Sequence, residues 1–130
     1  MTTTHSESRE DYLESILILK RRTGAVRSID IAEYFNYSRP SVSRAMSILR
    51  KDDLISVDRN GYIDLTDEGR RQAEAVFARH ETLMLFLEKL GVSSASARKD
   101  ACRMEHILCD ETMACIGRFV AGYTEKEPQE

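Results

Sequence analysis

The chain has 130 residues, of which 42% are hydrophobic and 32% are charged, and its net charge is −3 at pH 7. This is near the usual size of one domain and provides for one modest hydrophobic core. The sequence has no apolar run near the roughly 20 residues of a membrane-spanning helix. It also has no Walker loop, dinucleotide-binding fingerprint, nucleophile elbow or HExxH motif, so the readily recognised enzyme classes are excluded.

Three cysteines, Cys102, Cys109 and Cys115, lie close together in the C-terminal part of the chain. An odd number of cysteines crowded into one segment is not a disulfide framework. The polar N-terminus has no basic patch followed by an apolar stretch, which a secretory signal would require. Both observations favour a reducing cytoplasm, and we expect no membrane partner.

The charge is unevenly distributed along the chain. Residues 20–61 contain nine basic and five acidic residues (+4), and the remainder contains 10 basic and 17 acidic residues (−7). Because affinity for phosphate depends on the local potential, a basic N-terminal third can bind DNA even on an acidic protein. Charge also varies by chance along a sequence, so this excess alone does not decide the question.

Three helices are predicted in the N-terminal part. Apolar residues recur with the helical period from Arg9 onward, and Gly24 favours the end of this helix, whereas residues 1–8 are expected to be irregular. A short helix over 29–34 follows, with Ser28 as its expected N-cap. After a tight turn, Ser38 is expected to cap a third helix whose first turn contains a proline.

A β-hairpin and three more helices are predicted in the rest of the chain. Apolar and polar residues alternate over 55–57 and 63–65 around an Asn-Gly pair, which is typical of a hairpin. A long helix is expected over 66–90, and shorter helices over 95–108 and 110–120. The predicted fold class is therefore mainly α with one small β-hairpin.

Three helices followed by a hairpin are typical of a winged helix-turn-helix, in which the third helix enters the major groove of DNA. Arginine is the commonest specific reader of guanine, and serine donates to phosphates or bases. An arginine at the hairpin tip would reach a phosphate or the minor groove, although an ordinary solvated helix face is the alternative interpretation. The predicted DNA-binding residues are Arg27, Ser38, Arg39, Pro40, Ser41, Ser43, Arg44, Ser47 and Arg59.

A second cluster of reactive side chains lies near residue 105. Cys102, Glu105, His106 and Cys109 are spaced i, i+3, i+4 and i+7, so on one helix they would share an arc of about 100°. Thiolate, carboxylate and imidazole groups together form a set of ligands for a first-row transition metal. The alternative is a half-exposed helix with a buried cysteine and a surface Glu-His pair. We expect Cys109 to lie in the core.

Further candidate ligands lie on the first helix and on the long helix. A lone histidine on an apolar face is most often an ordinary core residue, and acids near a helix N-terminus are favoured by the helix dipole. Carboxylates that border an apolar face are nevertheless costly unless they are paired or coordinated. If the three helices pack together, six ligands meet, enough for one or two divalent ions. The candidate ligands are Asp11, Glu14, His80, Cys102, Glu105 and His106.

Six segments carry a likeness to a known family: EDYLESI (10–16), TGAVRSIDIAEYF (23–35), SRPSVSRAMSILRKDDLI (38–55), LTDEGRR (65–71), RHETLMLFL (79–87) and DACRMEHILCDET (100–112). Together they resemble the DtxR/MntR family of metal-dependent transcriptional repressors. The resemblance covers about residues 9–122, which is nearly the whole chain. The CRMEH string, following an RH pair on the long helix, is its most specific part.

The resemblance implies a homodimer. Residues 1–72 would form the winged helix-turn-helix, and residues 73–130 a helical metal-binding and dimerisation domain. Apolar residues of the last helix, Ile116 and Phe119 among them, would pack against the partner subunit. The resemblance also implies a palindromic double-stranded DNA operator, repression of metal-uptake genes and no enzymatic activity. A metal ion and the operator would strengthen each other's binding, since both favour the same arrangement.

The resemblance implies Mn(II) or Fe(II) as the effector, with Co(II) or Zn(II) also binding in vitro. Five of the six ligand positions match the short, manganese-type members of the family. At Cys102 those members have a carboxylate, whereas iron-type members have cysteine, and a thiolate favours Fe, Co or Zn over Mn. Iron-type members also have methionine where Asp11 stands, and their ancillary site is broken here by Met84 and Arg98.

Three other interpretations remain open on the sequence. A winged-helix regulator that needs no metal is the main alternative, and metal-insensitive operator binding would support it. A two-metal hydrolase would need an open coordination position with a general base or a phosphate-binding loop, none of which is evident. A metal-buffering or purely structural dimer would leave the basic third helix and the wing without a purpose.

Overall fold

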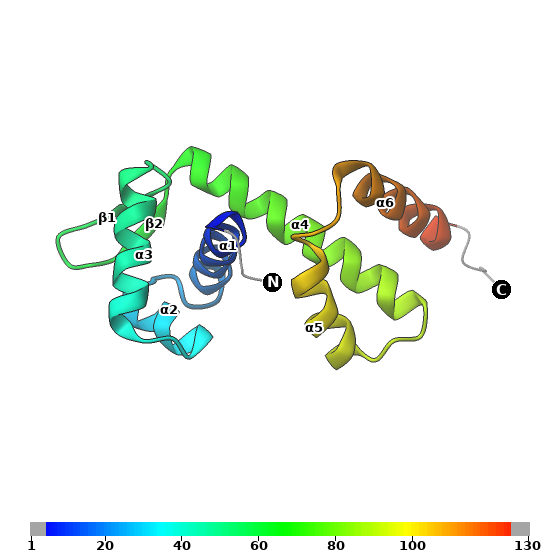
Figure 1. Ribbon diagram of the computed structural model, residues 1–130, viewed down its shortest axis with the longest axis horizontal. Coiled ribbons are helices and arrows are strands. Elements are labelled where there is room, and N and C mark those ends of the chain that lie inside the picture. The colour runs from blue at the N-terminus through cyan, green and yellow to red at the C-terminus, as the bar shows by residue number, and fades with distance from the viewer. Residues whose placement is uncertain (1–4, 126–130) are drawn as a thin grey trace. The chain divides into compact units, whose positions relative to one another are not determined.

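The computed structural model describes residues 5–125, and the side chains of residues 9–122 within that range. Three helices, two strands and three further helices follow one another along this part of the chain (Figure 1). They form two compact units, one up to Ala75 and the other from Val76 onward. The predicted fold class, mainly α with one small β-hairpin, is confirmed. None of the helices described is long and apolar enough to cross a membrane.

Helix α1, His5–Thr23, supplies a large part of the core of the N-terminal unit. It buries Leu13, Ile16 and Leu17, which the helical period places on one face. The expected end at Gly24 is confirmed by its positive φ of 86°. Irregular chain was expected up to residue 8, but the helix begins at His5. Residues 1–4 lie outside the described range.

Helix α2, Ser28–Phe35, begins one residue earlier than predicted. Its N-cap is Arg27 and not Ser28, because the Asp30 carboxylate accepts a hydrogen bond from the Arg27 backbone N–H at 2.9 Å. The Asp30 side chain thus reaches back to the backbone of the N-cap, as the N3 residue of a capping box does. The helix ends at Asn36, whose φ of 61° lies in the left-handed region that asparagine tolerates.

Helix α3, Arg39–Lys51, begins as predicted. The Ser38 hydroxyl caps it by accepting a hydrogen bond from the Ser41 backbone N–H at 3.3 Å. Val42, Met46 and Leu49 are buried, so one face of α3 is fixed in the core. The opposite face is therefore held outward by the same packing.

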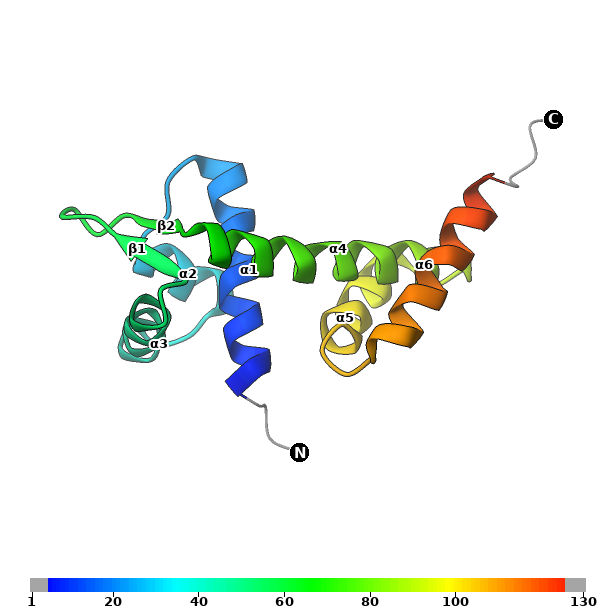
Figure 2. The same cartoon turned by 90° about the horizontal axis from the view of Figure 1, so that it is seen from above.

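The predicted hairpin consists of β1, Ile55–Val57, and β2, Ile63–Leu65, which pair antiparallel. Its turn is stabilised by the Asp58 carboxylate, which accepts hydrogen bonds from the backbone N–H groups of Asn60 at 2.8 Å and Tyr62 at 2.9 Å. The loop projects beyond the helices of its own unit, as Figure 2 shows. The winged helix-turn-helix predicted for this part of the chain is thus present.

Helix α4, Asp67–Lys89, starts in close contact with the chain that precedes β1. The Thr66 hydroxyl accepts a hydrogen bond from the Gly69 N–H at 3.0 Å and donates one to the Asp53 carbonyl at 2.8 Å. Gly69 lies directly against the Leu54 carbonyl, which a Cβ atom at this position would overlap. Only glycine fits here without displacing the backbone.

The C-terminal unit packs the second part of α4 against α5, Ser94–Met104, and α6, Asp110–Glu125. Leu83 and Leu87 of α4 and Ala97 and Ala101 of α5 form its buried core. The two alanines allow the helices to approach closely, and apolar side chains of α6 pack against the same cluster.

The prediction that α5 continues to residue 108 is wrong. The helix ends at Met104, and the chain turns through residues 105–108 before α6 begins. The last turn tightens, because the His106 N–H binds the carbonyl of Arg103, three residues back. The interpretation that Cys102, Glu105, His106 and Cys109 share one helix face is therefore wrong as well.

Replacing Gly69 with alanine is expected to lower the free energy of unfolding by about 1–3 kcal/mol, because the new methyl group overlaps the Leu54 carbonyl. Thermal unfolding followed by circular dichroism measures the change. Gly117→Ala is the matched control, because a Cβ there meets nothing within 4 Å and alanine favours a helix. A G69A variant as stable as the parent would contradict the close approach.

Candidate DNA-binding surface and candidate metal centre

The residues predicted to contact DNA lie on one exposed surface of the N-terminal unit. Ser38 and the predicted residues of α3 are all exposed, whereas the residues between them that face inward are buried. Arg59 lies in the loop of the hairpin and is also exposed. The exposed α3 residues are Arg39, Pro40, Ser41, Ser43, Arg44 and Ser47.

Arg27 lies between this surface and the wing, which is the hairpin formed by β1 and β2. Its guanidinium lies 5.3 Å from the centroid of the Tyr62 ring, and its backbone forms an isolated β-bridge with Tyr62. Arg27 and Arg39 line a hollow of about 430 Å³ together with Ser43 and Gly61. Two guanidinium groups at one hollow favour an anion such as a DNA phosphate. Sequence reasoning missed the stacking on Tyr62, because nothing in the sequence pairs these two positions.

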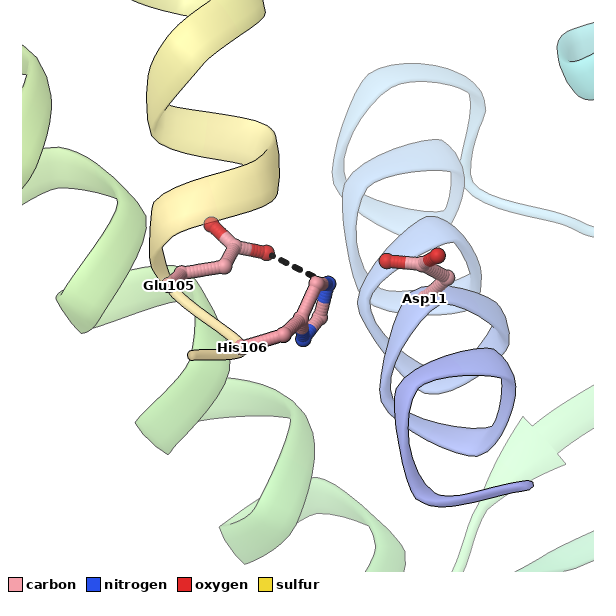
Figure 3. A group of neighbouring side chains, drawn as sticks. All are labelled: Asp11, Glu105 and His106. Atoms are coloured by element: carbon pink, nitrogen blue, oxygen red, sulfur yellow. Dashed lines mark ion pairs between the residues drawn. The ribbon is translucent and has the colours of Figure 1, made fainter. Parts of the chain in front are cut away.

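The C-terminal unit gathers four of the six candidate metal ligands: His80 from α4, Cys102 from α5, and Glu105 and His106 from the turn that follows α5. The Oε1 atom of Glu105 lies 3.0 Å from Nδ1 of His80, and its Oε2 atom lies 3.5 Å from Nε2 of His106. Figure 3 shows Glu105 and His106 with this ion pair drawn. Cys102 is more peripheral, with its Sγ atom 3.9 Å from Nδ1 of His80.

Glu105 is a buried carboxylate, only 2% exposed. Its Oε2 atom is buried and accepts no hydrogen bond, since the contact with His106 has ion-pair distance without hydrogen-bond geometry. A buried carboxylate oxygen without a hydrogen bond is costly. A divalent cation fits this arrangement, because carboxylate oxygen and imidazole nitrogen are both ordinary ligands for one.

The surroundings of His80 strongly favour its protonated form. A hydrogen bond with the Cys102 thiol and one with the Glu105 carboxylate raise the pKa of His80 from 6.5 to about 10, while partial burial opposes the rise. The negative charge of Glu105 adds to this effect. In the metal-free protein at neutral pH, the imidazolium therefore supplies the positive charge that faces Glu105.

Asp11 and Glu14 lie three residues apart on α1 of the N-terminal unit, so they share a face of that helix. Asp11 is half-buried, and Glu14 is buried with 8% of its surface exposed. Figure 3 also labels Asp11 on its helix. Both residues offer the oxygen ligands that Mn(II) prefers.

The expectation that Cys109 lies in the core is wrong. Cys109 precedes α6 and is exposed, because α5 has already ended at Met104. Hydrogen bonds from the Thr112 hydroxyl and the backbone at the start of α6 lower the pKa of the Cys109 thiol. Cys115 of α6 is also exposed in the single chain.

Sequence reasoning missed Arg79, the residue before His80. Its guanidinium donates hydrogen bonds to the main-chain carbonyls of Glu105, at 2.6 and 3.0 Å, and of Leu108, at 2.9 Å. The sequence contains Arg79 in its RH pair but does not show its role, because its partners are main-chain atoms 26 and 29 residues away.

The geometry of the N-terminal unit defines a class of protein. Three helices and a projecting hairpin, with the third helix exposed, form a winged helix-turn-helix of the kind that binds DNA.

Two family models match the chain. A Crp-like helix-turn-helix domain matches residues 16–70, and the metal-binding and dimerisation domain of the iron-dependent repressors matches residues 66–129.

Curated relatives narrow the class further. The transcriptional regulator MntR of Geobacillus kaustophilus is 34% identical over 120 residues, which cover 92% of this chain and 85% of the relative. MntR of Escherichia coli is 34% identical over 117 residues, covering 90% of this chain and 76% of the relative. The chain belongs to the DtxR/MntR family of transcriptional regulators, which are not enzymes.

Solved structures agree with this assignment. A manganese-dependent transcriptional repressor in complex with manganese has 30% identity and a TM-score of 0.80, covering 87% of this chain. The manganese regulator SloR has 27% identity and a TM-score of 0.77, covering 93% of this chain. The chain spans only 52% and 55% of the lengths of these two structures, respectively.

We expect the His80 ring to stay protonated between pH 6 and 9 in the metal-free protein, because its pKa is raised to about 10. NMR titration of the imidazole protons measures this, with His80→Gln to assign the signals. A raised pKa stabilises the folded state fully below pH 6.5, and this contribution is lost as the pH rises through about 10. His80→Gln should therefore destabilise the protein more at pH 6 than at pH 10. Titration of the ring near pH 6.5 would refute the assignment.

Proposed function

We propose that the protein is a DNA-binding repressor of metal-ion uptake genes that responds to Mn(II) or Fe(II). The observation that carries this proposal is the buried Glu105 carboxylate beside two imidazoles, with one oxygen that accepts no hydrogen bond. A side chain placed in this way gains the most from a bound cation. The names of two relatives, both MntR, and of a manganese-bound neighbour support the same class of effector.

The proposed metal ligands come from three helices. Asp11 and Glu14 of α1 supply carboxylate oxygens, and the C-terminal unit supplies the nitrogen, oxygen and sulfur ligands. When bound, the ion would supply positive charge that replaces the proton of His80 as the partner of Glu105. The proposed ligands are Asp11, Glu14, His80, Cys102, Glu105 and His106.

The choice between Mn(II) and Fe(II) depends on Cys102. The other five ligands are carboxylates and imidazoles, which suit manganese, whereas a thiolate favours Fe, Co or Zn. Cys102 is exposed and borders the cluster, so it can join or leave the ligand set without disturbing the core. Co(II) and Zn(II) are expected to bind in vitro. One related structure, ScaR, contains bound Zn(II).

We further propose that the protein acts as a homodimer on a palindromic operator. Residues 1–72 would bind double-stranded DNA, and residues 73–130 would bind the metal and the partner subunit. Large apolar side chains are exposed on the C-terminal unit of a single chain, Ile107 by 71% and Phe119 by 54%, and a dimer interface would cover them. The metal would favour the arrangement that fits the operator, and linkage requires the operator to tighten metal binding equally. We place the repressor in the cytoplasm, where Cys102 stays reduced.

A regulator that ignores metal is the second candidate. The hydrogen bond between His80 and Glu105 favours it, because one oxygen of the carboxylate is already bound without an ion. In this case the ligand-like residues would serve only to stabilise the C-terminal unit.

Metal-dependent operator binding distinguishes the two candidates. Metal-free protein is titrated under anaerobic reducing conditions with Mn(II), Fe(II), Co(II) and Zn(II), and binding to a palindromic operator is measured at fixed salt. We expect at least one metal to tighten binding about tenfold or more, which is a typical coupling. His80→Ala should abolish this gain, whereas Cys115→Ala, outside the proposed ligand set, should retain it. Equal operator affinity with and without every metal would favour the metal-independent regulator.

Arginines on the exposed surface should contribute differently to DNA binding. Arg44→Ala is expected to weaken binding to the operator by about 1–3 kcal/mol, because a base contact is lost. The difference in affinity between the operator and unrelated DNA should therefore become smaller. Arg27→Ala should weaken binding to both kinds of DNA similarly, as expected of a phosphate contact. It should also lower the slope of log affinity against log salt concentration by about 1. Fluorescence anisotropy with operator and scrambled duplexes measures both. An R44A variant that weakens both duplexes equally would contradict the assigned role.

A further inference from the structure

Arg79 makes an unusual set of contacts within the C-terminal unit. Its side chain is 28% exposed and reaches from α4 to the segment that joins α5 and α6. Its Nη2 atom donates to the carbonyls of Glu105 and Leu108, its Nε atom donates to the Glu105 carbonyl, and its Nη1 atom lies 3.4 Å from the Asp110 carboxylate. One guanidinium therefore binds three residues of the connection.

The need for these contacts follows from the way α5 ends. The N–H groups of Glu105, His106 and Leu108 bind back to carbonyls of α5. The carbonyls of Glu105 and Leu108 belong to the connection that follows α5, where no continuing helix supplies N–H groups to bind them. Arg79 supplies donors for both, so it holds this connection from another helix.

We propose that Arg79 is the positioning residue of the metal centre, an inference that rests on the proposed function. Arg79 and His80 are consecutive on α4, and Glu105 and His106 are consecutive in the turn that follows α5. The guanidinium holds the Glu105 main chain while the Glu105 side chain meets both imidazoles. Three proposed ligands are thus fixed relative to one another through a single side chain.

Fixing the ligands in advance raises metal affinity, because less conformational freedom is lost when the ion binds. Arginine is well suited to this role, since its planar fork binds two acceptors at once and it stays charged at every relevant pH. The Asp110 contact adds little, because Asp110 is fully exposed. The two carbonyl contacts carry the inference.

A purely structural contact would give a different result from a positioning residue. Loss of a structural contact lowers stability and leaves the ligand geometry of the folded molecules unchanged. Loss of a positioning residue changes the affinity and the ligand field of a bound ion even when the protein remains folded. Outer partners of metal ligands typically contribute about 10–100-fold in metal affinity.

The test compares full-length Arg79→Met and Arg79→Lys with the parent. Fold is checked in the metal-free state by circular dichroism, thermal unfolding and size-exclusion chromatography. Co(II) alone is then the probe, and its absorption bands report both affinity and ligand geometry. We expect R79M to bind Co(II) about 10–100-fold more weakly with shifted bands. The Co(II) affinity of R79K should lie between those of R79M and the parent, because an ammonium group replaces only part of the guanidinium fork.

Arg118→Met is the matched control, because Arg118 donates to Cys115 on α6 and touches none of the proposed ligands. It should bind Co(II) as the parent does. Folded R79M with affinity within twofold of the parent and identical bands would overturn the inference while leaving the proposed function intact. If R79M does not fold, R79K decides by the same criterion. A parent protein that binds no Co(II), Mn(II) or Fe(II) would refute the proposed function, and the inference with it.

Discussion

The buried carboxylate of Glu105 is the constraint on which the C-terminal unit depends. A charged group that is 2% exposed is costly unless its surroundings compensate for the charge. His80 provides that compensation by binding the carboxylate, while Arg79, the residue before it on α4, holds the Glu105 main-chain carbonyl. The placement of α5 against α4 and the electrostatics of the candidate metal centre are therefore set by the same few contacts.

The N-terminal unit also holds polar side chains in place in the absence of a ligand, here the arginines proposed to bind DNA. Arg27 is held at its backbone by Asp30 and at its guanidinium by the Tyr62 ring. The buried face of α3 fixes the direction of Arg44 in a comparable way. An arginine held in place loses less freedom on binding a phosphate or a base, so both contacts can favour DNA more strongly than mobile arginines would.

Local signals account for most of what the sequence predicted correctly. Asn36, Ser38 and the Asn-Gly pair at the wing mark helix ends and turns through their own backbone preferences, so those boundaries are confirmed. The end of α5 was mispredicted because the apolar and ligand-like spacing continues past Met104, whereas the chain there turns and is held by Arg79, which is distant in sequence. The candidate ligands His80, Cys102, Glu105 and His106 were proposed from residue type, spacing and the family resemblance. Their arrangement was not predicted, since it depends on the turn after Met104.

The metal-free state of this centre is itself an ion pair, and that affects how tightly it would bind a metal. With the pKa of His80 raised to about 10, a proton on the imidazole faces Glu105 until an ion replaces it. The affinity for any ion is therefore reduced by the free energy of the pair it breaks. Cys102 strengthens that competition, because its contact with His80 is the largest cause of the raised pKa. The same thiol, once deprotonated, favours Fe(II) or Co(II) over Mn(II). Proton competition at His80 lowers the affinity for every ion alike, so selectivity between metals would come from the sulfur that Cys102 offers.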